Sequence, residues 1–253
     1  MEGTDFTGKV VLVTGGSRGM GKAMVEAFAA RGASVVIASR RLDACEQLAR
    51  EVRDRHGVAA LAVACNVSRW ADCDALVDTV YRQLGGVDVL VNNAGLSPLY
   101  PSLDEVSEAL FDKVIGVNLR GPFRLGSAIG TRMAAGGADS RGGSIINISS
   151  VAAIRPGPHE LPYAAAKAGL NALTEGMAQA FAPAVRVNAI QAGPFRTDIA
   201  KAWSPQTLAR IEQGVALCRV GEPAEIVGAA LYLASDAASF CTGAVLRVDG
   251  GVR

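Results

Sequence analysis

Short runs of continuous apolar residues alternate with amphipathic stretches along almost the whole chain. The run at residues 10–13 is mostly β-branched and is followed directly by glycines. Such a run predicts a strand buried on both faces, and the amphipathic stretch after it predicts a helix. Strands and helices that alternate in this way are typical of a parallel sheet with helices on both faces. We therefore expect a doubly wound α/β fold.

The same alternation predicts about seven strands. They are expected at residues 10–13, 34–38, 60–64, 87–91, 144–148, 185–190 and 244–248. Helices are expected at residues 19–31, 42–56, 70–84, 105–119, 123–135, 161–181 and 223–234, with a glycine-rich connection at 136–143. Because no linker-like change of composition interrupts the pattern, we expect the 253 residues to form one domain. Ligands of such sheets bind beyond the carboxyl ends of the strands.

Composition excludes several classes of function. With 25 basic and 24 acidic residues the net charge is +1, which argues against nucleic acid as a partner because phosphate neutralisation needs a basic face. Residues 1–5 do not resemble a signal peptide, and no apolar run approaches the roughly 18–20 residues of a membrane span. The five cysteines lack metal-ligand spacing, so we expect no metal site and reduced thiols in a cytoplasmic protein.

A glycine-rich turn follows the first expected strand, with the sequence Thr14-Gly-Gly-Ser-Arg-Gly-Met-Gly21. Glycines let a backbone turn tightly and approach a pyrophosphate, and the amino end of the next helix supplies free N–H groups and partial positive charge. The spacing G-x-x-x-G-x-G differs from the general dinucleotide fingerprint. Taken alone, the turn therefore fits either nucleotide binding or a purely structural role.

Further motifs follow in a fixed order along nearly the entire chain. They are Asn92-Asn93-Ala94-Gly95, Asn118, Ser150, Tyr163-x-x-x-Lys167 and the loop at 193–197. Together with the glycine-rich turn, they resemble the short-chain dehydrogenase/reductase family, and the 3-oxoacyl-acyl carrier protein reductases within it. The resemblance implies a Rossmann-type sheet that binds a nicotinamide dinucleotide. It places cofactor contacts at Gly15, Ser17, Arg18, Gly19, Met20, Gly21, Ser39, Arg40, Asn66, Val67, Asn93, Ala94, Gly95, Tyr163, Lys167, Gly193, Phe195 and Thr197.

Tyr163 and Lys167 are four residues apart on an expected helix, so they share one face. A phenol has an ordinary pKa near 10, and a nearby ammonium lowers that pKa by favouring the phenolate. Such a tyrosine can give a proton to a developing alkoxide or take one from an alcohol. The same spacing also fits an ordinary pair on a helix surface, and only the other motifs favour catalysis.

The resemblance assigns roles to three further residues. Ser150 ends an expected strand, where its hydroxyl can bind a substrate carbonyl, while the adjacent Ser149 points to the opposite face. Asn118 is implied to take part in a proton relay through water to the lysine. Asn93 is implied to face the cofactor, and Asn92 to be structural. His159 lies four residues before Tyr163, where it either contacts substrate or is simply solvated.

The end of the second expected strand bears on the choice of dinucleotide. Enzymes that use NAD usually place an acidic residue there, whereas arginine accommodates the 2′-phosphate of NADP. The resemblance to the family places Ser39 at the acidic position and Arg40 at the adjacent phosphate-binding position, which favours NADP(H). NAD(H) stays open, because Arg40 and Arg41 could simply begin a solvated helix. Asn66 stands where many relatives have aspartate, and its oxygen can still accept a hydrogen bond from adenine.

The motifs together predict a ketone or aldehyde reductase that uses NADP(H), reversible as an alcohol dehydrogenase. Its substrate would be a small carbonyl compound or secondary alcohol, including 3-oxoacyl thioesters linked to a carrier protein or coenzyme A. An alcohol dehydrogenase that prefers NAD, and a non-catalytic dinucleotide sensor on the same fold, are the alternatives. Residues 197–221 are expected to form a substrate lid. The resemblance further implies a homotetramer or homodimer.

Overall fold

Seven parallel strands form the centre of the molecule. The computed structural model describes residues 4–135, 142–197, 200 and 203–252. The strands lie in the order β3-β2-β1-β4-β5-β6-β7, which confirms the predicted seven-stranded, doubly wound sheet. They are β1 (Val10–Thr14), β2 (Ser34–Ser39), β3 (Ala60–Ala64), β4 (Val89–Asn92), β5 (Gly143–Ser150), β6 (Val185–Ala192) and β7 (Val245–Val248).

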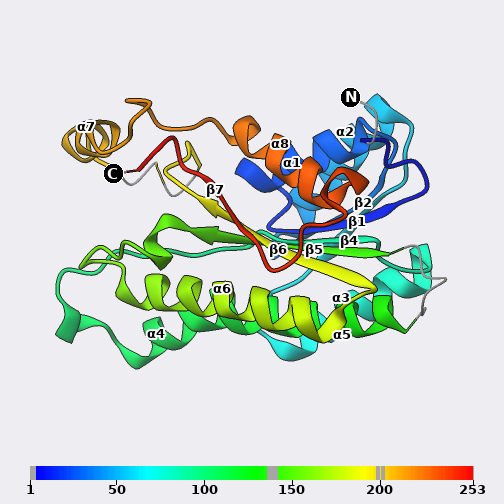
Figure 1. Cartoon of the computed structure of the whole chain (residues 1–253), viewed down its shortest axis with the longest axis horizontal. Helices are drawn as coiled ribbons and strands as arrows, with labels where there is room; N and C mark the ends of the chain where they lie inside the picture. Colours follow the sequence, from blue (N-terminus) through cyan, green and yellow to red (C-terminus); the bar gives the residue numbers. More distant parts are fainter. Residues whose placement is uncertain (1–3, 136–141, 198–199, 201–202, 253) are drawn as a thin grey trace.

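Helices cover both faces of the sheet, and each face has its own apolar core. One layer holds α1 (Gly19–Ala29), α2 (Leu42–His56) and α8 (Val227–Ala234) (Figure 1). The other holds α3 (Trp70–Leu84), α5 (Gly121–Ala134) and α6 (Leu161–Phe181), with α4 (Glu108–Ile115) beside α6. Within the described ranges, every helix is too short or too polar to cross a membrane.

Two expected helices are interrupted. The helix predicted at 105–119 is divided into a 3₁₀ turn η1 (Leu103–Glu105), α4, and a π-helical turn η2 (Gly116–Arg120) that leads into α5. The helix predicted at 223–234 opens with a 3₁₀ turn η6 (Pro223–Ile226) before α8. Apolar periodicity does not distinguish these tighter and wider turns from an α-helix, because all three leave similar residues on the buried face.

One helix was not predicted at all. It is α7 (Pro205–Gln213), within the segment expected to be a lid. Its start has a local signal, because the Ser204 side chain accepts a hydrogen bond from the backbone of Thr207 and Pro205 occupies the first turn. The expected lid and the expected glycine-rich connection at 136–143 both fall partly outside the described residues.

A buried chain of amide and hydroxyl groups ties the sheet to α6. The Asn92 Nδ2 donates to Asn147 Oδ1 at 2.9 Å, and the Asn147 Nδ2 donates to Thr174 Oγ1 at 2.9 Å. The Thr174 hydroxyl donates a hydrogen bond to the carbonyl of Leu170 at 2.8 Å. Since buried polar groups must be paired, this chain holds β4, β5 and α6 in one arrangement.

Removing the middle acceptor of this chain should destabilise the fold. Thr174→Val keeps the shape of the side chain but leaves the Asn147 amide unpaired, so we expect a loss of about 1–3 kcal/mol in the free energy of unfolding. Urea denaturation measures it. The control is Thr131→Val on the exposed side of α5, where a change within about 0.5 kcal/mol is expected. Equal losses in both variants would contradict the proposed importance of the chain.

Candidate active site

The sequence motifs meet at the carboxyl edge of the sheet, where a buried threonine joins two of them. Thr14 ends β1, and its Oγ1 accepts hydrogen bonds from the backbone N–H groups of Asn93 at 3.0 Å and Ala94 at 3.1 Å. The Asn93 Nδ2 donates in return to the carbonyls of Thr14 at 2.9 Å and Gly15 at 3.2 Å. The side-chain amide nitrogen of Asn93 is therefore engaged in shaping the glycine-rich turn.

Three glycines of the glycine-rich turn, Gly15, Gly16 and Gly21, have no room for a side chain. Gly15 and Gly19 adopt φ of 62° and 52°, which glycine tolerates best. A Cβ added at Gly21 would lie 2.2 Å from the Gly15 carbonyl oxygen. The N-cap residue of α1 is Arg18, whose side chain makes no capping hydrogen bond, and the amino end of a helix carries partial positive charge. The turn fits the pyrophosphate of a dinucleotide.

At the end of β2, Ser39 takes the place of a carboxylate. Its Oγ accepts a hydrogen bond from Ser17 Oγ at 3.1 Å and donates to the carbonyl of Arg41 at 3.2 Å. Cys45 Sγ lies 3.0 Å from Ser39 Oγ, and burial raises the pKa of the Cys45 thiol. These contacts of the Ser39 hydroxyl close the turn between β2 and α2. Arg40, the next residue, is exposed.

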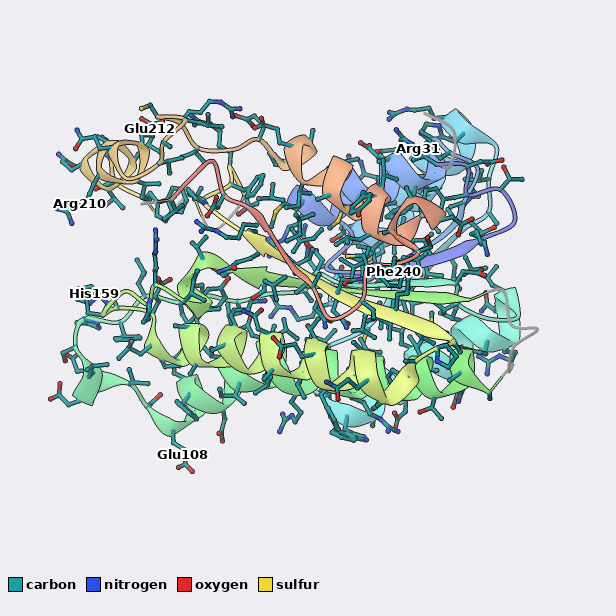
Figure 2. The ribbon with its side chains drawn as sticks, viewed as in Figure 1. Arg31, Glu108, His159, Arg210, Glu212 and Phe240 are labelled. Carbon is teal, nitrogen blue, oxygen red and sulfur yellow. The ribbon has the colours of Figure 1, made fainter. Side chains whose placement is uncertain are left out.

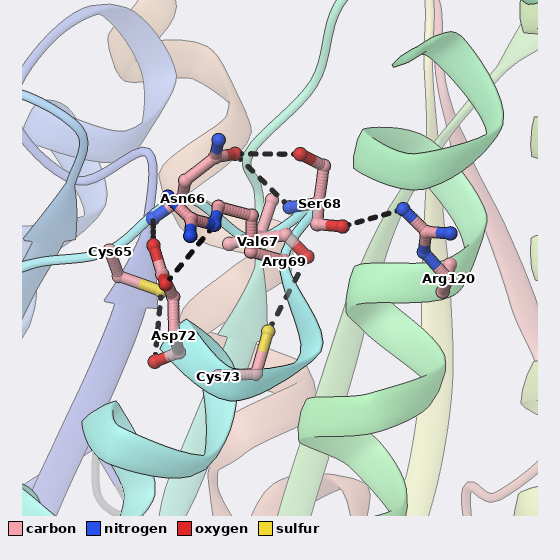
Figure 3. Close-up of polar contacts among 8 residues, drawn as sticks. All are labelled: Cys65, Asn66, Val67, Ser68, Arg69, Asp72, Cys73 and Arg120. Carbon is pink, nitrogen blue, oxygen red and sulfur yellow. Dashed lines mark hydrogen bonds and ion pairs between the residues drawn. The ribbon is translucent and has the colours of Figure 1, made fainter. Parts of the chain in front are cut away.

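The loop after β3 presents Asn66 in a defined orientation (Figure 3). The Asn66 Oδ1 accepts hydrogen bonds from the Ser68 backbone at 3.2 Å and hydroxyl at 2.9 Å. A flipped amide would set its NH₂ against the Ser68 N–H, donor against donor, so this orientation is the favoured one. The oxygen expected to accept from adenine therefore already accepts two hydrogen bonds, and Asn66 has its NH₂ group to offer a base.

The same loop is anchored from two sides. Asp72 Oδ2 accepts a hydrogen bond from the backbone of Asn66 at 3.2 Å, and Arg120 Nη2 donates to the carbonyl of Ser68 at 2.7 Å (Figure 3). Val67 is buried, and its carbonyl accepts a hydrogen bond from the Cys73 thiol at 3.4 Å. Arg120 belongs to the π-helical turn η2, so this turn helps to hold the loop.

Tyr163 and Lys167 project from the first turns of α6 toward the end of β5. The Lys167 side chain is 3% exposed, and its Nζ donates to the carbonyl of Ile148 at 2.7 Å and lies 5.6 Å from the centroid of the Tyr163 ring. Ser150 ends β5, where its Oγ accepts a hydrogen bond from the Ala152 N–H at 3.2 Å and its hydroxyl is close enough to influence the phenol of Tyr163. Ser149 instead points to the other side, where its hydroxyl bonds the carbonyl of Lys167 at 3.4 Å.

Burial decides the ionisation of this pair. Desolvation raises the pKa of Tyr163 to about 12, an effect that the Ser150 hydroxyl opposes and the charge of Glu160 reinforces. Desolvation also lowers the pKa of Lys167 to about 8. The predicted lowering of the Tyr163 pKa is wrong for this structure. At the pH where the phenol would ionise, Lys167 has already lost its proton, so no ammonium is left to stabilise the phenolate.

Asn118 lies in the π-helical turn η2, and both polar atoms of its side chain are hydrogen-bonded to backbone. Its Nδ2 donates to the carbonyls of Leu96 at 2.8 Å and Val114 at 2.9 Å, and its Oδ1 accepts from the Leu96 N–H at 3.2 Å. A Cβ added at Gly95 would lie 3.4 Å from this Oδ1 and 4.0 Å from Lys167 Nζ. Asn118 and Lys167 thus approach the same point, and π turns often occur at such functional sites.

The loop after β6 reaches back to the glycine-rich turn. A Cβ added at Gly19 would lie 3.5 Å from the Thr197 methyl carbon. Gly193 packs so closely on the chain near the carboxyl terminus that a Cβ would lie 2.5 Å from the Asp249 Cα. Phe195 is buried and pairs with Gly221. This loop therefore brings Thr197 beside the candidate cofactor site.

The predicted site residues thus form one continuous arrangement, with His159 exposed at its rim. Residues that the prediction missed include Glu160, which influences Tyr163 directly. Its position three residues before Tyr163, directly before the start of α6, is a signal that was available in the sequence. Within the described part of the chain, no three His, Cys, Asp or Glu side chains gather as metal ligands would.

Comparison with known proteins identifies the family. A family model described as enoyl-(acyl carrier protein) reductase matches residues 15–253. The 3β-hydroxysteroid dehydrogenase 1 of Eggerthella lenta is 44% identical over 256 residues, which covers 98% of this chain and 95% of that protein. The chain belongs to the short-chain dehydrogenase/reductase family. The predicted family is therefore confirmed, and the protein is an oxidoreductase of the class that uses nicotinamide dinucleotides.

Solved structures of this family superimpose on nearly the whole chain. A 7α-hydroxysteroid dehydrogenase complexed with NADH and 7-oxo glycochenodeoxycholic acid matches with a TM-score of 0.92 and 33% identity, over 98% of this chain and 96% of that one. A 3-ketoacyl-(acyl-carrier-protein) reductase from Brucella melitensis, complexed with NADH, matches with a TM-score of 0.90 and 34% identity, over 97% and 98%.

Glu160 should influence the pH dependence of this dehydrogenase/reductase. Its negative charge disfavours the phenolate of Tyr163, so Glu160→Gln should lower the pKa of Tyr163. We expect the rising limb of the pH profile for alcohol oxidation to move to lower pH. The control is Glu175→Gln, farther along α6 on its exposed side, which should leave the profile in place. A shift to higher pH, or the same shift in both variants, would contradict this interpretation.

Proposed function

We propose that this protein is an NADP(H)-dependent oxidoreductase that transfers hydride between the nicotinamide and a carbonyl compound or secondary alcohol. The observation that carries the proposal is the placement of Tyr163: its side chain is half-buried, its ring centroid lies 5.6 Å from the buried Nζ of Lys167, and the Ser150 hydroxyl at the end of β5 is close enough to influence its phenol. The cofactor, when bound, supplies or accepts the hydride. Tyr163 serves as general acid for reduction and as general base for oxidation.

The ionisation of the site suits the reduction of a carbonyl. With a pKa of about 12, Tyr163 holds its proton at neutral pH and can give it to the oxygen of the substrate as negative charge develops there. The Ser150 hydroxyl is placed to donate a hydrogen bond to the same oxygen. Lys167, with a pKa of about 8, is still mostly protonated at neutral pH and can return a proton to Tyr163.

Asn118 is proposed to hold a water molecule in the path of that proton. Its Oδ1 accepts one backbone hydrogen bond, from Leu96, and a carbonyl oxygen has two lone pairs. The second lone pair can hold a water beside Lys167, because both side chains approach the position of Gly95. Such a water would connect Lys167 with solvent.

The preference for NADP(H) is proposed from the end of β2. Ser39 leaves no carboxylate to repel a 2′-phosphate, and Arg40 beside it is exposed and able to bind one. The dinucleotide phosphates would be held by the glycine-rich turn, the adenine by the loop of Asn66 and Val67, and the nicotinamide end by Gly193 and the loop after it. The two solved relatives named above were crystallised with NADH, so an NAD preference is the alternative to test.

An apolar rim around the site favours an apolar substrate. Leu99, Ile154 and Leu217 are 65%, 53% and 62% exposed, and they follow β4, β5 and α7. The segments that carry Ile154 and Leu217 both contact residues 250–252. The Arg155 side chain donates a hydrogen bond to the carbonyl of Val252, and the Leu217 N–H donates one to the carbonyl of Gly250. We propose that residues 197–221 form the lid of a pocket for ring systems or acyl chains, including hydroxysteroids and 3-oxoacyl thioesters.

A hydroxyl-deletion variant tests the chemistry. The protein is assayed for NADPH oxidation with keto-steroids, acetoacetyl thioesters, β-keto esters and aryl ketones. Tyr163→Phe should lower turnover of the best substrate by about 10²- to 10⁴-fold, because it removes the proton donor, and should leave NADPH binding intact. A wild-type protein that binds NADPH but turns over no ketone, nor any alcohol in reverse, would instead support a dinucleotide sensor.

A second variant tests the cofactor preference. Arg40→Ala should lower kcat/KM for NADPH about 10- to 100-fold, because one charge-assisted hydrogen bond to the 2′-phosphate contributes about 1.5–3 kcal/mol. The value for NADH should change little. Arg50→Ala, on an exposed position of α2, is the matched control. A wild-type enzyme that prefers NADH would contradict the NADP(H) proposal and leave the mechanism intact.

We also infer that the protein is a homo-oligomer, either a dimer or a tetramer, in a reducing cytoplasm. An apolar groove of about 380 Å³ lies across the outer helices, lined by Ile115, Leu119, Arg120, Phe123, Gly169 and Leu173. A second copy of the chain would cover it, and light scattering of the purified protein tests this assembly. The five cysteines are all free, which suits a reducing compartment.

A further inference from the structure

Helix α6 carries Tyr163 in its first turn, yet its start is not capped in the usual local way. The N-cap residue is Glu160, and among the described residues its side chain makes no capping hydrogen bond. The first backbone amides of a helix have no partner within the helix. Pro162, in the same turn, has no N–H group at all. Leu161, the first residue of α6, therefore depends on another part of the chain for a hydrogen-bond acceptor.

Tyr100 supplies that acceptor from 61 residues upstream. Its hydroxyl accepts a hydrogen bond from the Leu161 N–H at 2.7 Å and donates one to the carbonyl of Pro158 at 3.1 Å. The Tyr100 side chain is 7% exposed and comes from the loop after β4. Its ring lies 6.5 Å from that of His159, which Figure 2 places at the end of the molecule where α7 lies.

These contacts make Tyr100 a bridge between two segments of the site. Its loop follows the Asn92–Gly95 motif, which is joined to the glycine-rich turn through Thr14. The two groups that its hydroxyl binds lie on either side of Glu160, within five residues of Tyr163. Since its donor and one acceptor position are both used by backbone, this hydroxyl is committed to the protein rather than to a substrate.

We propose that Tyr100 is a positioning residue for the reaction, because it caps α6 from a distance and thereby fixes the turn that holds Tyr163. The kinetic part of this proposal rests on the proposed function, whereas the cap itself does not. Small displacements of a proton donor lower its rate strongly, since proton transfer needs a close and aligned approach.

The first test removes only the hydroxyl. Tyr100→Phe keeps the ring and should lower kcat about tenfold, with the KM and Kd for NADPH unchanged, because Tyr100 is not among the residues proposed to hold the cofactor and its hydroxyl is bound to backbone. The solvent deuterium isotope effect on kcat should increase, since proton transfer becomes slower than the other steps. Tyr232→Phe, on the exposed side of α8, is the matched control and should behave like the wild type. An unchanged kcat in Tyr100→Phe overturns the proposal.

A double variant separates positioning from general weakening of the fold. If Tyr100 acts through Tyr163, adding Tyr100→Phe to Tyr163→Phe should leave the residual rate unchanged, because the group being positioned is already absent. If Tyr100 only supports the fold, the second substitution should lower the residual rate by the same factor as in the wild type. That result would overturn the positioning role.

Hydrogen exchange tests the cap without any turnover. The Leu161 amide should exchange slowly in the wild type and much faster in Tyr100→Phe, while amides in the middle of α6 keep their protection. If the wild type reduces no ketone, the proposed function fails and this measurement still decides about the cap. Should Tyr100→Phe not fold, the wild type alone decides, because fast exchange at Leu161 would overturn the proposal.

Discussion

The site depends on one buried hydroxyl. Thr14 ends the inner strand β1 and binds the backbone of the neighbouring loop after β4, and Asn93 in that loop binds the backbone of the glycine-rich turn. Parallel strands bring their carboxyl ends to one edge but leave the loops there free to separate. This reciprocal pairing joins the candidate phosphate site to the loop that continues toward Asn118 and Tyr100. The glycine-rich turn and the loop that leads to Tyr100 are therefore held at a fixed separation.

Burial sets the chemistry within that frame. Lys167 and Tyr163 lie close together, and desolvation disfavours the charged form of each, so the pKa values of the two groups move apart. Between about pH 8 and 12 both groups are neutral in the free protein. The sign for stability follows for Lys167: the unfolded chain keeps the lysine proton up to a higher pH, so this group makes folding more favourable as pH rises from about 8 toward 10.5.

Regular elements were predictable because their periodicity is strong. The bounds of α2, β3, α3 and α6 agree with the sequence prediction at both ends. The short helix α7 was missed because few apolar residues mark its face, although Ser204 and Pro205 announce its start. Side-chain environment was less predictable: the spacing of Tyr163 and Lys167 says that they meet, but not that both are desolvated. Contacts such as that of Tyr100 with Leu161 join distant segments, and a single sequence carries no signal for them.

The π-helical turn η2 has a consequence for how this site could change in the course of evolution. It carries Asn118, which faces Lys167, and Arg120, which holds the loop of Ser68. A π turn contains one residue more than an α-turn would, and each residue rotates a helix by about 100°. Loss of one residue here would turn Asn118 and Arg120 relative to each other. A deletion here would therefore disturb the contacts of Asn118 and Arg120 together, whereas a substitution of either residue removes only its own.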